Sequence, residues 1–148
     1  MTDPEGGSQT KGPVAFNWIG LAVADLARSR RFYEELLDFT YERELAPPDW
    51  PTSKFCQVDP PVNLTAVYLR LGGFVLELLH FDREGNPPPR NGSMNEPGLT
   101  HLSVNVADLR DVVDRVTGYG GTVLADTDLG AAIFIRDPDG QLIELLAG

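Results

Sequence analysis

Two stretches of the chain repeat one another, and this internal similarity limits the fold more than any other feature. WIGLAVADL from Trp18 aligns with HLSVNVADL from His101, 83 residues further along. VYLRLGGFVLELL from Val67 aligns with IFIRDPDGQLIELL from Ile133 once a single turn residue is allowed. Both matches occur in the same order, so we predict two modules, residues 14–81 and 98–148.

Each module begins with an alternating strand that ends at an aspartate, and a helix is predicted to follow. Asp25 and Asp108 are of a type that caps the free N–H groups of a helix start, and apolar residues then recur at three-to-four spacing. Further strands come next, and DPDG at 137–140 is a strong hairpin turn signal. The order βαβββ, found twice, predicts one α+β domain with a mixed sheet.

Three segments fall outside these patterns. Residues 1–13 are predicted to form a flexible tail, and residues 82–97, rich in proline and glycine, are predicted to link the modules. The proline-rich segment 42–64 carries Trp50 and Phe55. It is predicted to form an irregular strand and a long loop.

The composition excludes several classes of partner. A formal net charge of −10 and a pI near 4.5 leave no electrostatic footprint for nucleic acid or for an anionic membrane surface. No stretch approaches the length of a membrane span, and the N-terminus lacks the apolar centre of a signal peptide. Cys56 is the only cysteine, so neither a disulfide nor a thiolate zinc site is predicted. We expect a cytoplasmic protein that acts on a small molecule.

Strand alternation predicts which side chains share a face. In HLSVNV the aliphatic residues turn toward a helix, and His101, Ser103 and Asn105 lie on the opposite face, which is too polar for a closed core. Glu77 and Glu144 are acids in apolar strands, where an ionised carboxylate is costly unless it is paired, hydrogen-bonded or metal-bound. One such glutamate often simply points to solvent. Two at equivalent positions of a repeat, together with a histidine, predict a small-molecule site.

The motifs WIGLAVADLARSRRFYEELLDF, GLTHLSVNVADL and IRDPDGQLIELL resemble those of the vicinal oxygen chelate superfamily. That superfamily includes glyoxalase I, methylmalonyl-CoA epimerase, extradiol dioxygenases, and the fosfomycin and bleomycin resistance proteins. The resemblance implies a curved, U-shaped sheet with helices on its outer face, a homodimer, and one divalent metal ion (Mn, Fe, Co, Ni, Mg or Zn). It also implies four ligand positions, held here by Trp18, Glu77, His101 and Glu144.

Trp18 separates two hypotheses for the function. Indole cannot bind a metal, but one imidazole and two carboxylates can still hold a hard or borderline divalent ion if waters complete the shell. The first hypothesis is a metal-dependent lyase or isomerase, similar to glyoxalase I or methylmalonyl-CoA epimerase, in which Glu144 or Glu77 removes a proton next to a carbonyl or thioester. The alternative is a metal-free protein, similar to the bleomycin resistance proteins, that sequesters a small molecule. The candidate pocket residues are Trp18, Ser103, Asn105, Trp50 and Phe55, with Tyr68 as a further candidate for the pocket lining.

Two other activities of the superfamily fit these residues less well. An extradiol dioxygenase needs two histidines and one carboxylate at Fe(II), and His80 is predicted to face away from Glu77. A fosfomycin-type transferase needs a basic pocket for a phosphonate. Arg70 and Arg136 lie near the relevant strands, but both are at turns, where a solvated charge is usual.

Overall fold

A computed structural model describes residues 12–90 and 92–148. They form two compact units, each described here by itself. Unit 1 contains the described residues up to Val23 together with Phe39–Arg83. Unit 2 contains Ala24–Asp38 together with the described residues of Glu84–Gly148. The predicted flexible tail lies outside the described residues, except for its last two.

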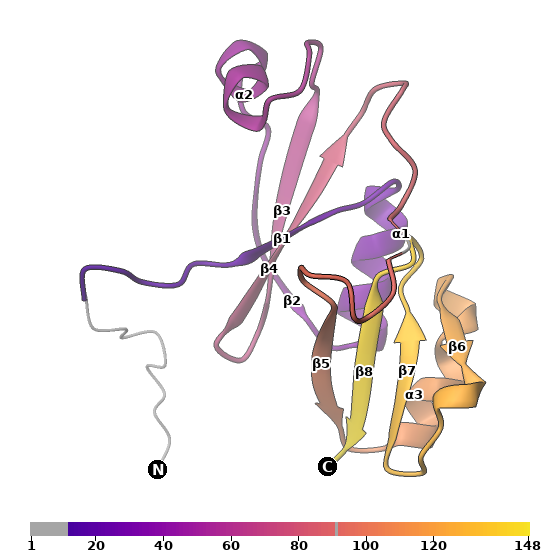
Figure 1. The fold of residues 1–148 in the computed structure, drawn as a ribbon. Helices are drawn as coiled ribbons and strands as arrows, with labels where there is room; N and C mark the ends of the chain where they lie inside the picture. Colours follow the sequence, from indigo (N-terminus) through magenta and orange to yellow (C-terminus); the bar gives the residue numbers. More distant parts are fainter. Residues whose placement is uncertain (1–11, 91) are drawn as a thin grey trace. The chain divides into compact units, whose positions relative to one another are not determined.

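Unit 1 is built on a four-stranded mixed sheet (Figure 1). Its strands are β1 (Ile19–Ala22), β2 (Thr40–Leu45), β3 (Leu64–Leu71) and β4 (Phe74–Phe81). Their order is β1-β4-β3-β2, with β1 parallel to β4 and the other neighbours antiparallel. On one face of β3 and β4 the central residues are completely buried: Val67, Leu69, Leu76 and Leu78. The other face carries a smaller apolar cluster of Ala66, Tyr68, Val75 and Leu79.

Unit 2 repeats this sheet and adds helices. Its strands are β5 (His101–Val106), β6 (Thr122–Leu124), β7 (Ala132–Arg136) and β8 (Leu142–Ala147), in the order β5-β8-β7-β6. Its helical elements are α1 (Leu26–Arg31), which continues into a π-helical turn (Phe32–Leu36), α3 (Leu109–Arg115), and the 3-10 turns Thr117–Tyr119 and Ala125–Thr127. Because both sheets have the same strand order, the predicted α+β fold of two βαβββ repeats is confirmed.

Both main helices start at the predicted aspartates. The Asp25 carboxylate accepts a hydrogen bond of 3.0 Å from the backbone N–H of Arg28, and the Asp108 carboxylate accepts one of 3.0 Å from that of Asp111. Gly120 ends the second helical region with a φ of +88°, a conformation that glycine adopts at little cost. Each cap satisfies backbone groups that have no partner inside the helix.

The helical segment of the first repeat is attached to the β7–β8 turn of unit 2. The buried Tyr33 hydroxyl donates a hydrogen bond of 2.7 Å to Asp137, which also accepts from the backbone N–H groups of Asp139 and Gln141. Arg28 forms an ion pair of 3.1 Å with Asp139. The DPDG segment therefore makes the predicted hairpin turn and also holds a helix from the other repeat. For this reason the compact units cut across the repeat.

The connection between β2 and β3 is more regular than its proline content predicts. It contains an eight-residue helix, α2 (Asp49–Cys56), where we expect a loop. Pro51 lies in the first turn, where a missing N–H costs little because that group has no helical partner. The Asp49 carboxylate accepts hydrogen bonds of 2.9–3.1 Å from the backbone N–H groups of Val62 and Asn63. The loop prediction is therefore wrong for α2, because these contacts close the connection from a distance along the chain.

A β-bulge in β2 decides which side chain lies over β3. Tyr41 pairs with Leu69 and Arg43 pairs with Tyr68, so Glu42 is the extra residue on the bulged strand. A bulge of this kind reverses the alternation of faces beyond it. Tyr41 and Arg43 consequently lie on opposite faces of the sheet, and Arg43 shares a face with Tyr68.

The predicted linker, residues 82–97, contains turns but neither a helix nor a strand among its described residues.

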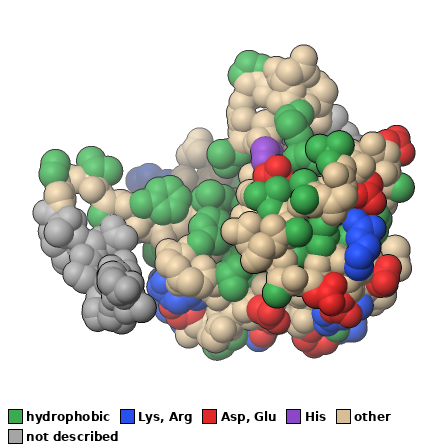
Figure 2. Space-filling model, turned by 90° about the horizontal axis from the view of Figure 1, so that it is seen from below, with side chains coloured by type: hydrophobic (Ala, Val, Ile, Leu, Met, Phe, Trp, Pro, Cys, Tyr) green, Lys and Arg blue, Asp and Glu red, His purple; other side chains and the backbone are tan. Residues whose placement is uncertain are grey.

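In the parts of the chain that the structure describes, no helix has the length and apolar character needed to cross a membrane. Figure 2 shows basic side chains next to acidic ones at several places on one face of the molecule, and a histidine side chain beside an acidic one.

Candidate functional site

The first of the two strand glutamates, Glu77, lies in the middle of β4. Gly20 of β1 and Tyr68 of β3 are its cross-strand neighbours. A side chain at Gly20 would begin 3.4 Å from Glu77 Oε1, so the glycine leaves the space beside the carboxylate. On the other side the Tyr68 hydroxyl donates a hydrogen bond of 2.5 Å to Glu77 Oε2. The carboxylate therefore already has a polar partner within its own sheet.

Four residues form what we call the first cluster: Trp18, Arg43, Tyr68 and Glu77. The rings of Trp18 and Tyr68 meet edge to face, with centroids 4.9 Å apart and an interplanar angle of 73°. The Arg43 guanidinium carbon lies 3.9 Å from the Tyr68 ring centroid and 5.7 Å from that of Trp18. Tyr68 is 4% exposed and Trp18 is 38% exposed. The cluster thus combines a buried phenol, an accessible indole and a cation.

The Tyr68 hydroxyl is a strong donor site over the whole physiological pH range. Burial raises the pKa of Tyr68 to about 12, and the hydrogen bond and negative charge of Glu77 act in the same direction. The positive charge of Arg43 opposes this rise of the pKa in part. The phenol stays protonated, so it keeps donating to the carboxylate.

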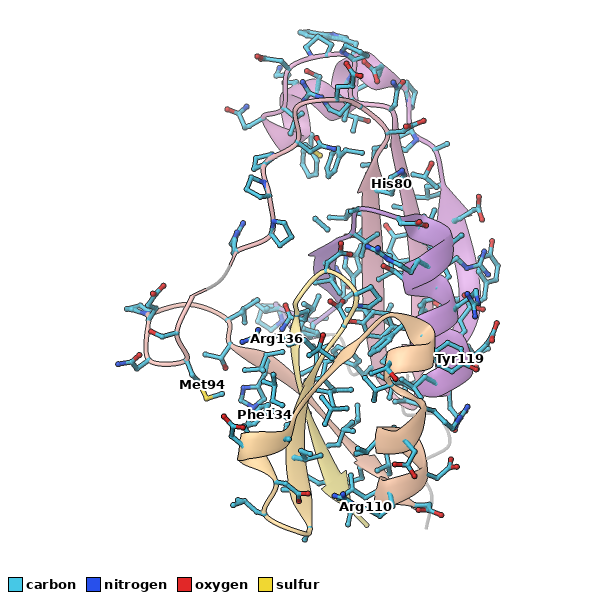
Figure 3. The ribbon with its side chains drawn as sticks, turned by 90° about the vertical axis from the view of Figure 1, so that its right-hand side faces the viewer. His80, Met94, Arg110, Tyr119, Phe134 and Arg136 are labelled. Atoms are coloured by element: carbon cyan, nitrogen blue, oxygen red, sulfur yellow. The ribbon has the colours of Figure 1, made fainter. Side chains whose placement is uncertain are left out.

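The second cluster lies in unit 2 and consists of His101, Phe134 and Glu144. His101 Nε2 is 3.7 Å from Glu144 Oε1, and His101 Nδ1 is 2.8 Å from the Thr100 hydroxyl. The Phe134 ring meets the imidazole edge to face, with centroids 5.2 Å apart. Figure 3 shows Phe134 and Tyr119 on opposite sides of the second sheet, with the helices on the side of Tyr119. An imidazole and a carboxylate, each partly exposed, therefore meet on the helix-free face.

The two clusters occupy equivalent positions of the repeat. Tyr68 and Phe134 each lie directly across from the strand glutamate of their own sheet. The edge-to-face contact that Trp18 makes with Tyr68 is made by His101 with Phe134. Relative to the second cluster, the first has an indole in place of an imidazole, an added hydroxyl and an added guanidinium.

The other predicted pocket residues divide into two pairs. Ser103 and Asn105 are exposed on β5 and alternate with less exposed aliphatic residues, as the sequence predicts. Trp50 and Phe55 lie on α2, where 72% and 90% of their surfaces are exposed. These two rings have little contact with the rest of the protein, and their role in a pocket stays a prediction.

Neither cluster, taken by itself, fits a divalent metal ion. In unit 1, Glu77 accepts the Tyr68 hydrogen bond, and Trp18 brings no donor atom. Arg43 adds a positive charge to the first cluster, and this charge repels a second cation. The second cluster offers one imidazole and one carboxylate, fewer protein donors than metal sites usually have. Among residues 12–90 and 92–148 no group of three or more His, Cys, Asp and Glu side chains is arranged to hold a metal ion.

Two members of the clusters, Phe134 and Arg43, are not among the residues predicted from the sequence. Phe134 aligns with Tyr68 in the repeated segments, so the alignment itself carried a signal for this residue. Arg43 carries no such signal. Regular alternation would put Arg43 on the face of Tyr41, and only the bulge at Glu42 moves it to the face of Tyr68.

Comparisons with known proteins agree with this architecture. Residues 15–145 match the family model of the Glyoxalase/Bleomycin resistance protein/Dioxygenase superfamily. A glyoxalase family protein from Bacillus cereus is 18% identical with a TM-score of 0.73, over 95% of this chain and 99% of that one. The trypanothione-dependent glyoxalase I of Leishmania major is 26% identical with a TM-score of 0.64, over 90% and 87% of the two chains.

A third similar structure is the fosfomycin resistance protein FosX of Listeria monocytogenes, which is 15% identical with a TM-score of 0.60 over 90% of this chain and 91% of that one. FosX has also been crystallised with Mn(II) and a sulfate ion. No curated protein matches the chain significantly. Because the family model spans residues 15–145, nearly the whole chain, this chain belongs to the Glyoxalase/Bleomycin resistance protein/Dioxygenase superfamily.

Proposed function

We propose that the protein binds an aromatic small molecule at the first cluster, without a metal ion. The observation that carries this proposal is the hydrogen bond from Tyr68 to Glu77, made beside the guanidinium of Arg43. It engages the carboxylate that a metal would need and places a positive charge nearby. The accessible part of the first cluster is the aromatic surface of Trp18.

The exposure of Trp18 supports an aromatic ligand. With 38% of its surface exposed, the indole is accessible to a ligand from solvent, and its edge-to-face contact with Tyr68 supports it from within the protein. Aromatic side chains supply large contact areas with a preferred stacking geometry. Small-molecule sites are typically lined by such apolar groups with a few polar groups that set the orientation.

Fluorescence quenching tests this proposal. Trp50→Phe leaves Trp18 as the only tryptophan, and Trp50 is exposed enough to be replaced without loss of packing. The probe is 4-nitrobenzamide, a neutral ring that quenches indole fluorescence. We expect saturable quenching that is unchanged by EDTA. In calorimetry, Trp18→Leu should weaken binding of the same probe roughly tenfold, because it removes the stacking surface.

Two results would count against the proposal. One is a requirement for added Mn or Ni before the probe binds. The other is equal binding of the probe by the wild type and by Trp18→Leu. Trp18→His is a useful third variant: if it changed neither metal affinity nor probe binding, Trp18 would have no role in the site.

A second candidate is a divalent-metal-dependent lyase or isomerase, in which Glu144 or Glu77 is the base. The short distance between His101 and Glu144 favours it, as does the 26% identity to the glyoxalase I of Leishmania major. This candidate predicts that the purified protein retains a metal and that His101→Ala removes both metal and activity. Metal analysis that stays blank after reconstitution with Mn, Fe, Co, Ni and Zn would rule against it.

Two properties expected from the resemblance and the composition belong to either candidate. We expect a homodimer, which analytical ultracentrifugation measures directly, and a cytoplasmic location, which fractionation of the source cells measures. A single monomer peak at all concentrations would contradict the first expectation.

A further inference from the structure

We infer that the first cluster selects an aromatic ligand that carries a carboxylate, and that Arg43 is the residue that recognises the charge. This inference rests on the proposed function, because it names the class of ligand that the first cluster binds. It goes further by assigning a specificity-determining residue that neither the repeat nor the predicted ligand positions indicate.

The bulge in β2 determines which charged side chain lies across from Tyr68. Without the extra residue, Glu42 would lie across from Tyr68, and a second carboxylate would face the wall beside Glu77. With it, Arg43 lies there instead, and Glu42 forms an ion pair of 2.6 Å with Arg70. One inserted residue thus places a cation beside Tyr68, where regular pairing would place a second carboxylate.

The acids near Arg43 have other partners, and Glu77 of the same cluster accepts the hydrogen bond of Tyr68. Glu42 pairs with Arg70, and Glu44 accepts a hydrogen bond of 3.3 Å from the Tyr41 hydroxyl on the other face of the sheet. The guanidinium of Arg43 stacks on the Tyr68 ring instead of meeting a carboxylate side-on. Stacking covers one face of a guanidinium, whereas hydrogen bonds to a carboxylate are made at its edge, in the plane. The two interactions are therefore compatible.

The dimensions of the cluster favour a ring and a carboxylate in one ligand. The guanidinium carbon is 5.7 Å from the centroid of the exposed Trp18 ring. A ring that covers the indole can therefore bring an attached carboxylate to the edge of Arg43, where two parallel N–H···O bonds form. The protein carries a net charge of −10, which disfavours anions in general. Preference for an anionic ligand at this wall must then come from a local cation.

The test compares two probes that differ only in charge, 4-nitrobenzoate and 4-nitrobenzamide, by quenching of Trp18 in the Trp50→Phe protein. We expect the benzoate to bind about tenfold more tightly than the amide. Arg43→Gln should abolish this preference, so that the Kd values for the benzoate and the amide agree within about twofold. Arg110→Gln is the matched control, because it removes one positive charge from α3 in unit 2 and should leave the preference intact.

Salt dependence provides a second measurement that needs no substitution. Raising NaCl from about 50 to about 500 mM should reduce the preference for the benzoate, because ions screen an exposed charge pair, and should leave amide binding unchanged. Equal binding of the two probes by the starting protein, or a preference that survives Arg43→Gln, would overturn the inference while the proposed function stands. Failure of both probes to bind would overturn the proposed function and the inference together.

Discussion

Tyr68 and Phe134 stand at the same place in the two sheets, each directly across from a strand glutamate, and they differ by one hydroxyl group. In unit 1 that hydroxyl holds Glu77 by a hydrogen bond. In unit 2 Phe134 has no hydroxyl to donate, and the carboxylate of Glu144 has the imidazole of His101 as its neighbour. The two strand glutamates therefore have different partners. Glu77 accepts a hydrogen bond from a phenol, and Glu144 lies beside an imidazole.

Tyr68→Phe should fold, because phenylalanine already fills the equivalent position of the other sheet. We expect a loss of about 1 kcal/mol in the free energy of unfolding at neutral pH, from the lost hydrogen bond to Glu77. The pKa of Tyr68 is raised to about 12 in the folded protein and is about 10 in the unfolded chain. The stabilisation linked to this shift of the pKa is fully present below pH 10 and is lost as the pH rises from about 10 to about 12.

Urea unfolding at pH 8 and at pH values above 10 measures this effect of Tyr68. The wild type should lose its advantage over Tyr68→Phe across that alkaline window. Tyr41→Phe, which removes an exposed hydroxyl from the same sheet, is the control. A constant difference between wild type and Tyr68→Phe at every pH would contradict the assignment.

Asp137→Asn should change how stability depends on pH in the acid range. Burial raises the pKa of Asp137, and hydrogen bonds from Tyr33 and from two backbone N–H groups lower it only in part. A raised pKa favours the protonated, folded form, so this contribution is complete below the ordinary carboxyl pKa of about 3.9 and is lost as the pH rises through the raised value. Wild type should therefore lose stability relative to Asp137→Asn in that window.

Unfolding curves collected from pH 4 to pH 8 test the prediction for Asp137. The amide of the variant keeps an oxygen for the backbone N–H groups, so the turn should persist. Asp111→Asn removes an exposed carboxylate from the same unit and is the control. If the two variants tracked the wild type equally across the window, the buried carboxyl would not be the source of the pH dependence.

Gly121→Ala should destabilise unit 2 by about 2 kcal/mol or more, as overpacking in a close-packed site does. An added Cβ would lie 2.6 Å from the carbonyl oxygen of Arg136 and 2.8 Å from side-chain atoms of Phe32 and Val116. Thermal unfolding measures the loss. Gly118→Ala, whose Cβ would meet nothing within 4 Å, is the matched control and should leave the melting temperature almost unchanged.

Asp49→Ala should loosen the connection that contains α2. It removes the carboxylate that accepts hydrogen bonds from the backbone of Val62 and Asn63, at a cost of about 1–2 kcal/mol for the unpaired groups. Limited proteolysis should then cut within residues 46–63 faster than in wild type. Asp59→Ala, an exposed acid of the same connection, should not change the cutting rate.

The features that could be predicted from the sequence are those that local rules and the repeat determine. Alternation and duplication predicted which strand residues are equivalent, and the register of Glu77 and Glu144 agrees. Capping chemistry predicted the helix starts at Asp25 and Asp108. These signals depend on residues close together in the chain, or on the chain's likeness to itself, so they can be read without coordinates.

Other features depend on contacts between distant segments. The helix α2 is supported by the hydrogen bonds of Asp49 to residues thirteen and fourteen positions later. The π-helical turn after α1 belongs to unit 2 because Tyr33 meets Asp137, 104 positions away. Proline content and helix periodicity contain no information about such partners.

The sequence by itself determined the architecture and the strand positions that carry Glu77, His101 and Glu144, because side-chain direction follows from strand periodicity. Only the tertiary structure decided what surrounds them. A single bulged residue moved Arg43 to the face of Tyr68, and cross-strand register gave Glu77 a phenol as its partner. Bulges and pairings are set by the balance of packing and hydrogen bonding over a whole sheet, which no local pattern records.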